Sequence, residues 1–220
     1  MTYSDVQTMM QEMYPGASSG FISTTALKLF CRKINMRLAG GPHKFSWAIR
    51  EYSLVLTGAT EYNLGTLIPD FVQLYQVPNS QSQGSEIGYQ SLRDFNVTLG
   101  GVSFTIVGDL IRFHNPPTSG TLVIPYYSNY LVKTSGGTRQ LDFTDGTDIS
   151  VIPESWATEF LIEGLCEYYQ RKEKEPLFLK PTVLYDGRVA NLTPFESQYF
   201  LAQQADNKVH NPTYDFRFEG

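Results

Sequence analysis

Apolar residues near the start of the chain recur with the period of an α-helix. From a cap at Ser23 or Thr24 to the break at Gly40, hydrophobic side chains follow one another at intervals of three and four residues. These positions are Leu27, Phe30, Cys31, Ile34 and Leu38. Because a helix advances by 100° per residue, they share one face, and the pattern predicts an amphipathic helix. A shorter helix, capped by Ser4 or Asp5, is predicted to precede it.

The other side of the longer helix is basic. Its cations are Lys28, Arg32, Lys33 and Arg37. Four charges on one side of a helix can contact an acidic subunit or the phosphates of DNA. The basic side has no interleaved aromatic residues that could stack on bases. Any contact with nucleic acid is therefore expected to be nonspecific and sensitive to salt. A solvated helix face is the alternative.

After the first 44 residues the pattern changes to the two-residue alternation of β-strands. Residues 45–57 are predicted to begin as a helix and to finish as a strand, and residues 69–77 alternate as a half-buried strand. Three further strands are predicted at 102–107, 110–114 and 121–127. Gly108–Asp109 supplies a tight hairpin turn, and Pro116–Pro117 must lie between strands because proline cannot donate a ladder hydrogen bond. We expect these three strands to form an antiparallel meander.

Two helical patterns follow the strands. Pro153 is predicted to open a helix with a broad apolar face formed by Trp156, Phe160, Leu161, Leu165, Tyr168 and Tyr169. Gly164 inside this helix costs ~1 kcal/mol relative to Ala, which close packing against another element would offset. A last helix is predicted to begin after Thr193, because Thr193 and Glu196 have the spacing of a capping box.

The order of helices, strands and helices predicts an α+β fold: a helical bundle with an inserted antiparallel β-sandwich or meander and an extended C-terminal tail. The expected segments are N-terminal helices at 1–44, a β-rich domain at 45–150, C-terminal helices at 151–209 that pack with the N-terminal helices, and the tail at 210–220.

Two segments are candidate contact sites. In the tail, three aromatic residues alternate with charged residues, so the tail either folds back on its own sheet or docks onto another subunit. The residues expected to dock are Tyr214, Phe216, Arg217 and Phe218. The polar loop 78–88 is the second candidate, either as a contact arm or as an ordinary surface loop. Its candidate residues are Gln81, Gln83 and Glu86.

Charge is distributed unevenly along the chain. The first 50 residues hold six of the 17 cations against two acids, a balance of +4, and the remainder holds 11 cations against 20 acids, a balance of −9. A basic end and an acidic body suit head-to-tail contact between copies or contact with nucleic acid, and solvated faces are the alternative. The 14 Tyr and 14 Phe residues favour burial against partners as well as in a core.

Residues that carry catalysis or bind metals are scattered. No histidine has a second His or a Cys at metal-ligand spacing, and the aspartates of Asp142–Asp148 lack the alternation of a calcium loop. Capped turns explain these aspartates better. Gly16–Gly20 matches a nucleophile elbow but follows no core strand, and Cys31 and Cys166 are expected to stay reduced. We therefore expect no enzyme, cofactor, metal or small-molecule substrate, and no membrane segment.

Three stretches carry a family resemblance. The first two are Tyr62-Asn63-Leu64 and Pro69-Asp70-Phe71-Val72-Gln73-Leu74-Tyr75-Gln76-Val77. The third is Phe104–Tyr127, which includes Pro116-Pro117-Thr118-Ser119-Gly120 and ends in two tyrosines. Their order, followed by an acidic stretch, a proline and a helix, resembles head-to-tail adaptor proteins of tailed bacteriophages, also called connector or head-completion proteins. The resemblance covers roughly residues 45–170.

The resemblance implies a ring, dodecameric in that family, that sits beneath the portal protein and receives the tail or the next neck protein. Double-stranded DNA would pass nonspecifically through the lumen of the ring. The C-terminal segment of such proteins reaches the portal, which makes the aromatic tail the candidate docking element. The implied location is the neck of the virion, after synthesis in the host cytoplasm.

Two other classes of function stay open. Another phage tail or baseplate module, or a carbohydrate-binding β-sandwich, would group exposed aromatic residues on one sheet face and form a monomer or trimer. An enzyme would need a concave pocket that unites polar residues lying far apart in the sequence.

Overall fold

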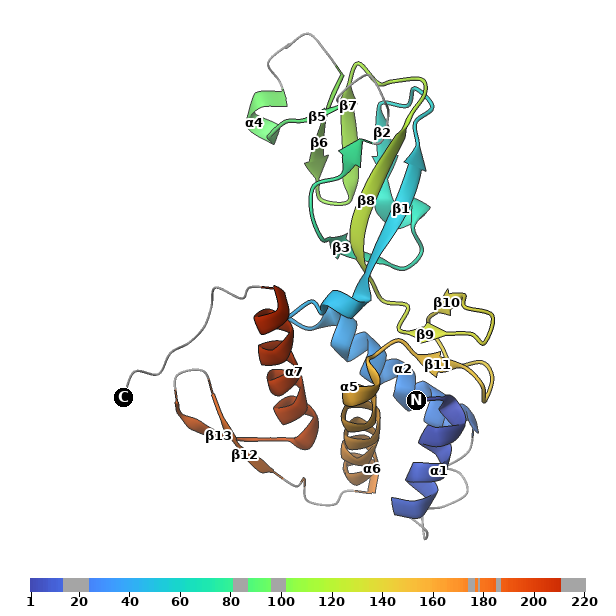
Figure 1. The fold of residues 1–220 in the computed structure, drawn as a ribbon, viewed down its shortest axis with the longest axis vertical. Coiled ribbons are helices and arrows are strands. Elements are labelled where there is room, and N and C mark those ends of the chain that lie inside the picture. The colour runs from blue at the N-terminus through green and yellow to red at the C-terminus, as the bar shows by residue number, and fades with distance from the viewer. Residues whose placement is uncertain are drawn as a thin grey trace. The chain divides into compact units, whose positions relative to one another are not determined.

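A computed structural model describes residues 1–13, 24–80, 87–95, 102–173, 177, 179–184 and 187–210. Helices and strands alternate in blocks along the chain, and the fold is α+β. The chain divides into two compact units (Figure 1). Unit 1 combines Met1–Ala48 with Tyr130–Gly220, and unit 2 is the inserted segment Ile49–Asn129.

Unit 2 is shorter at its C-terminal end than the predicted β-rich segment 45–150. Residues 130–150 belong to unit 1, together with the helices. They form the short strands β9 (Val132–Lys133), β10 (Arg139–Gln140) and β11 (Ile149–Ser150), in the order β10-β9-β11. The ring of Tyr3 stacks on Phe143 with centroids 5.3 Å apart, and Tyr3 N donates to the carbonyl of Asp148. These contacts attach the segment to the N-terminal helix, which the local strand pattern does not reveal.

The predicted helices are present in unit 1. They are α1 (Tyr3–Met13), α2 (Thr24–Gly40), α5 (Glu154–Thr158), α6 (Gly164–Glu173) and α7 (Pro194–His210). The capping box of α7 is confirmed, because Thr193 N donates to Glu196 Oε2 and Glu196 N donates to Thr193 Oγ1. The expected cap of α1, Ser4 or Asp5, is wrong. Thr2 is the cap: its N–H donates to Asp5 Oδ2, and its hydroxyl oxygen accepts from Asp5 N.

The centre of unit 1 is a π-helical stretch, η2 (Glu159–Glu163), between α5 and α6. Phe160, Leu161 and Ile162 are consecutive and all buried. A helix that is apolar around most of its circumference must be covered from several directions, and α1, α2 and α7 all contact η2. The sequence predicted one continuous helix here and missed the π stretch.

Gly164 begins α6 at a close crossing of helices. A Cβ at this position would lie 2.9 Å from Cδ1 of Ile34 in α2 and 3.1 Å from Cδ2 of Phe195 in α7. The close packing expected around this glycine is present, and its offset of the low helix propensity stays a prediction.

The segment between α2 and the first strand of unit 2 is attached to α7. His43 Nε2 lies 2.9 Å from Asp206 Oδ2, and the hydroxyl of Ser46 donates to Asp206 Oδ1 at 2.5 Å. The hydroxyl of Tyr199, two turns away on α7, donates to the carbonyl of His43 and accepts from its backbone N–H. The 3₁₀ turn η1 (Ser46–Ala48) is therefore fixed on unit 1 just before β1 begins.

Unit 2 contains two sheets. One has the order β1-β8-β3, with β4 also paired to β8, and the other has the order β2-β7-β6-β5. The bounds of the first are β1 (Ile49–Val55), β3 (Phe71–Leu74), β4 (Asn79–Ser80) and β8 (Thr121–Ser128). Those of the second are β2 (Glu61–Asn63), β5 (Gly88–Tyr89), β6 (Ser103–Val107) and β7 (Leu110–His114). Two single-turn helices, α3 (Leu64–Leu67) and α4 (Leu92–Phe95), lie between strands.

The predicted meander is wrong in its last strand. β6 and β7 form the expected hairpin, with Gly108 at φ 60° in its turn, but β8 leaves that sheet and pairs with β1. The change of sheet takes place at Pro116–Gly120, where Gly120 has φ 116° and Gly58 N donates to the carbonyl of Pro117. The prolines thus lie between strands, as predicted, but at a corner that joins two sheets.

The core of unit 2 draws side chains from both sheets. Its buried members are Leu54, Leu56, Leu64, Ile68, Ile87, Phe104, Ile111, Phe113, Leu122, Ile124 and Tyr126. β7 contributes Ile111 and Phe113, and β8 contributes Leu122, Ile124 and Tyr126, so these two strands bury alternate residues, as the two-residue period requires.

Candidate interaction surfaces

Asp70 connects the stretches that carry the family resemblance. Its buried carboxylate accepts hydrogen bonds from Nη1 of Arg50 at 2.6 Å, from the hydroxyl of Tyr126 at 3.0 Å and from the hydroxyl of Ser128 at 2.5 Å. The ring of Phe71 lies 5.9 Å from that of Tyr126. A buried carboxylate is stable when it is paired and saturated with donors. The Asp-Phe and Tyr-Tyr pairs of the sequence therefore meet in space and hold β3 to β8.

The predicted basic residues of α2 have partners within unit 1. Lys28 Nζ donates to the carbonyl of Thr144 at 2.6 Å, and Arg32 pairs with Asp142 at 3.4 Å. Arg37 pairs with the buried carboxylate of Glu167 at 3.2 Å and with Glu196 at 3.4 Å. Acids from the later part of the chain thus compensate much of the positive charge of its first part. The proposed subunit or DNA contact of these residues stays a prediction.

Lys33 differs from the other three cations. Its ammonium lies over two aromatic rings, 5.5 Å from the centroid of Phe30 and 5.9 Å from that of Tyr168 on α6. The two rings stack on each other with centroids 5.6 Å apart. The expectation that no aromatic residue accompanies the basic side of the helix is wrong, because α6 supplies one from a distant part of the sequence.

Two large apolar side chains are exposed beside Lys33. Leu29 is 50% exposed and Met36 is 54% exposed, and they lie one heptad apart on α2. The sequence carried this signal: both residues fall outside the apolar arc that α2 buries. These exposed apolar residues make the outer face of α2 a candidate contact surface.

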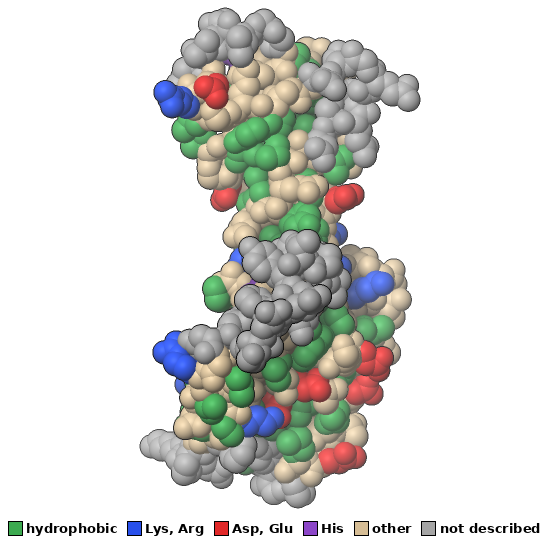
Figure 2. Space-filling view, turned by 60° about the vertical axis from the view of Figure 1, so that its left-hand side comes forward, with side chains coloured by type: hydrophobic (Ala, Val, Ile, Leu, Met, Phe, Trp, Pro, Cys, Tyr) green, Lys and Arg blue, Asp and Glu red, His purple; other side chains and the backbone are tan. Residues whose placement is uncertain are grey.

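A hairpin in unit 1 exposes a second apolar pair. β12 (Lys180–Val183) and β13 (Val189–Leu192) pair only with each other among the described strands. Thr182 on the inner face donates to Ser197 of α7 at 2.9 Å, whereas Val183 and Val189, cross-strand neighbours on the outer face, are 61% and 66% exposed. Figure 2 brings this side forward and shows hydrophobic side chains on the surface of unit 1. No pattern in the sequence predicted this hairpin.

The other two candidate sites cannot be placed. Loop residues Gln81, Gln83 and Glu86 and tail residues Tyr214, Phe216, Arg217 and Phe218 lie outside the described residues.

The loop Asp142–Asp148 is an internally capped turn, as predicted. Asp148 Oδ2 accepts from the backbone N–H of Thr144 and of Asp145, and from the side chains of Thr144 and Gln140. Burial opposes ionisation of Asp148, but these donors outweigh it and lower the pKa of its carboxyl below the ordinary value. Within the part of the chain that the structure describes, no group of three His, Cys, Asp or Glu residues is arranged to hold a metal ion.

Cys31 and Cys166 are buried, and neither forms a disulfide. Burial raises the pKa of the Cys31 thiol to about 12. Among the described helices, none combines the length and apolar character needed to cross a bilayer.

Comparison with known proteins adds no relative. No protein-family model matches the sequence, and no curated protein matches it significantly.

Proposed function

We propose that this chain is a structural subunit of a tailed bacteriophage, a head-to-tail adaptor that forms a ring between the portal and the tail or the next neck protein. The resemblance over residues 45–170 motivates the proposal, and the α+β fold with an inserted β unit is compatible with it. On this proposal unit 1 is the helical bundle of the adaptor, and the two sheets of unit 2 form its β-sandwich.

The observation that carries the proposal is the exposure of apolar side chains on separate elements of unit 1. Leu29 and Met36 on α2, and Val183 and Val189 on the β12–β13 hairpin, are each at least half exposed. Exposed apolar side chains on regular elements are typical of surfaces that contact other proteins. A ring subunit needs more than one such surface, because it has a neighbour on each flank.

The buried carboxylates support a non-catalytic role. Asp70, Asp148 and Glu167 each hydrogen-bond to side chains or backbone of this same chain. Hydrogen bonds of this kind hold the fold together. The proposal accordingly includes no cofactor and no small-molecule substrate.

The arrangement of aromatic residues favours an adaptor over a carbohydrate-binding module. The exposed tyrosines of unit 2 are Tyr75, which follows β3, and Tyr89 in β5, and these strands belong to different sheets. A sugar-binding platform would gather such rings on one face.

The internal ion pairs of Arg32 and Arg37 reduce the positive charge available to DNA. They favour DNA that passes through the ring without being held.

The test is the mass of the assembly. Purified chain is mixed with the portal protein encoded in the same genome, and complexes are measured by native mass spectrometry. We expect a portal-dependent complex that holds many copies of the chain in a closed ring, twelve if the stoichiometry of the resembled family applies. A chain that stays monomeric and ignores the portal would overturn the proposal. Deletion of residues 211–220 tests the tail separately, since unchanged portal binding would remove it from the docking contact.

A further inference from the structure

One face of unit 1 combines apolar exposure with uncompensated positive charge. On the outer side of α2, Lys33 lies between Leu29 and Met36, and all three are exposed. Among the described residues, no carboxylate lies within ion-pair distance of Lys33. Its ammonium is instead held over the rings of Phe30 and Tyr168. We call Leu29, Lys33 and Met36 the basic face.

The ion pairs next to this face involve other cations and do not include Lys33. Arg171, one turn beyond Tyr168 on α6, pairs with Oε1 of Glu167 at 2.8 Å. Nη1 of Arg37 pairs with the same oxygen at 3.2 Å. Glu167 is buried, while the side chain of Arg171 is 53% exposed. Arg37 also pairs with Glu196, so these two guanidinium groups meet two carboxylates, and Lys33 is the cation that the basic face presents outward.

The exposed side of α1 is acidic and therefore complementary in charge to Lys33. α1 contains no Lys or Arg, and its outward residues include Asp5, Thr8 and Glu12. A backbone hydrogen bond from Thr2 lowers the pKa of the Asp5 carboxyl, which keeps it charged. Met13, at the end of the helix, is 52% exposed. We call Asp5, Glu12 and Met13 the acidic face.

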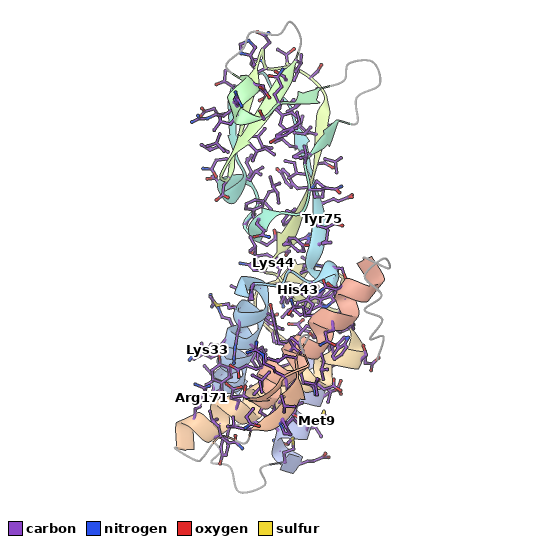
Figure 3. All side chains as sticks on the ribbon, turned by 90° about the vertical axis from the view of Figure 1, so that its left-hand side faces the viewer. Met9, Lys33, His43, Lys44, Tyr75 and Arg171 are labelled. Carbon is purple, nitrogen blue, oxygen red and sulfur yellow. The ribbon has the colours of Figure 1, made fainter. Side chains whose placement is uncertain are left out.

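The two faces point in different directions from unit 1. Figure 3 shows Lys33 and Arg171 on one side of this unit and Met9 of α1 on the other. Complementary faces on opposite sides of one subunit cannot meet within that subunit. They can meet between copies, and a contact between two different faces repeats from copy to copy as in a ring or filament.

We propose that the basic face of α2 docks onto the acidic face of α1 of a second copy of this chain. This inference deepens the proposed adaptor function and rests on it, since it assigns the lateral contact between subunits. In the contact, Lys33 faces the carboxylates of the next copy, and Leu29 and Met36 cover the apolar side chain of Met13. Charge pairing selects the partner face, and burial of the apolar side chains stabilises the contact.

Charge reversal tests the pairing of faces. Lys33→Glu and Glu12→Lys are made separately and together, and self-association is measured by sedimentation velocity with and without portal. Each single change is expected to weaken association by about tenfold or more, because it places like charges opposite each other. The double variant restores opposite charges and is expected to recover most of the association. Arg93→Glu on α4 of unit 2 is the control, since it makes the same charge change at an exposed site that belongs to neither face.

The outcomes separate this inference from the proposed function. Circular dichroism confirms that each variant is folded. If wild-type chains assemble and both single variants assemble equally well, the pairing of faces is overturned and the adaptor function survives. The pairing is also overturned if both single variants lose self-association and the double variant does not regain it. Wild-type copies that never associate, with or without portal, overturn both proposals.

Discussion

Nη1 of Arg50 lies 2.6 Å from Oδ2 of Asp70, and this ion pair joins the first strand of unit 2 to the turn before β3. The carboxylate is almost fully buried, and the hydroxyls of Tyr126 and Ser128 in β8 occupy its remaining acceptor sites. One acidic residue therefore holds three strands of the same sheet. Asp70-Phe71 and Tyr126-Tyr127 therefore stabilise this sheet, whatever the function of the protein is.

Replacement of Asp70 by Ala is expected to destabilise unit 2 by about 3 kcal/mol, since it removes a buried carboxylate that accepts from two hydroxyls and a guanidinium. The measurement is hydrogen exchange of the β8 amides, which reports on unit 2 alone. Glu51→Gln is the matched control, because Glu51 is an exposed carboxylate on β1. Equal exchange rates in the Asp70→Ala variant and the wild type would refute the central role of Asp70.

Gly164→Ala is expected to lower the free energy of unfolding by about 1 kcal/mol, although Ala is the better helix former. The added methyl group would lie 2.9 Å from Cδ1 of Ile34. Ile34→Val removes that carbon, so Gly164→Ala should be less costly in the Ile34→Val background, as measured by urea unfolding in a double-mutant cycle. Strict additivity of the two changes would contradict the close crossing.

The Cys31 thiol is expected to resist modification in the native protein. With its pKa raised to about 12 by burial, it holds very little thiolate at pH 8. A disulfide-exchange reagent should label Cys31 only after unfolding, and a Cys166→Ala variant isolates its signal. Rapid labelling of that folded variant at pH 8 would show that α2 opens far more readily than its packing indicates.

Asp148 is expected to make stability fall in acid. Its pKa is lower in the folded chain than in the unfolded chain, so its contribution is complete above the unfolded value of about 4 and is lost as the pH falls through the folded value. Asp148→Asn should therefore be less stable than the wild type at pH 7 and should show a weaker loss below pH 4. Thermal unfolding between pH 2 and pH 7 measures both effects. Parallel pH profiles would contradict the assignment.

Local patterns predicted most of the helices and strands. The capping box at Thr193 and the hairpin at Gly108 are encoded within a few residues, so the sequence alone was sufficient for them. The apolar row of α2 likewise predicted core positions, of which Leu27, Cys31, Ile34 and Leu38 are buried and Phe30 is partly buried. Such features depend on backbone geometry and on the period of the element that carries them.

Features set by distant contacts could not be predicted in this way. β8 follows β7 directly but pairs with β1, because the Pro116–Gly120 corner redirects the chain toward Gly58. The environment of Lys33 depends on Tyr168, which is far away in sequence. The internal partners of Arg32 and Arg37 come from the loop before α5 and from α6 and α7. A charge pattern along one helix cannot show which of its cations the rest of the fold will pair.

Hydroxyl-radical footprinting of the exposed apolar side chains tests most directly the claim that this protein works by contact with other polypeptides. Oxidation of Leu29, Met36, Val183 and Val189 is compared in the chain alone and in its complex with portal. We predict strong protection of Leu29 and Met36 in the complex, with Val55, an exposed residue of unit 2, as an internal reference. Unchanged oxidation of all four residues in a mixture that contains the portal would contradict the account.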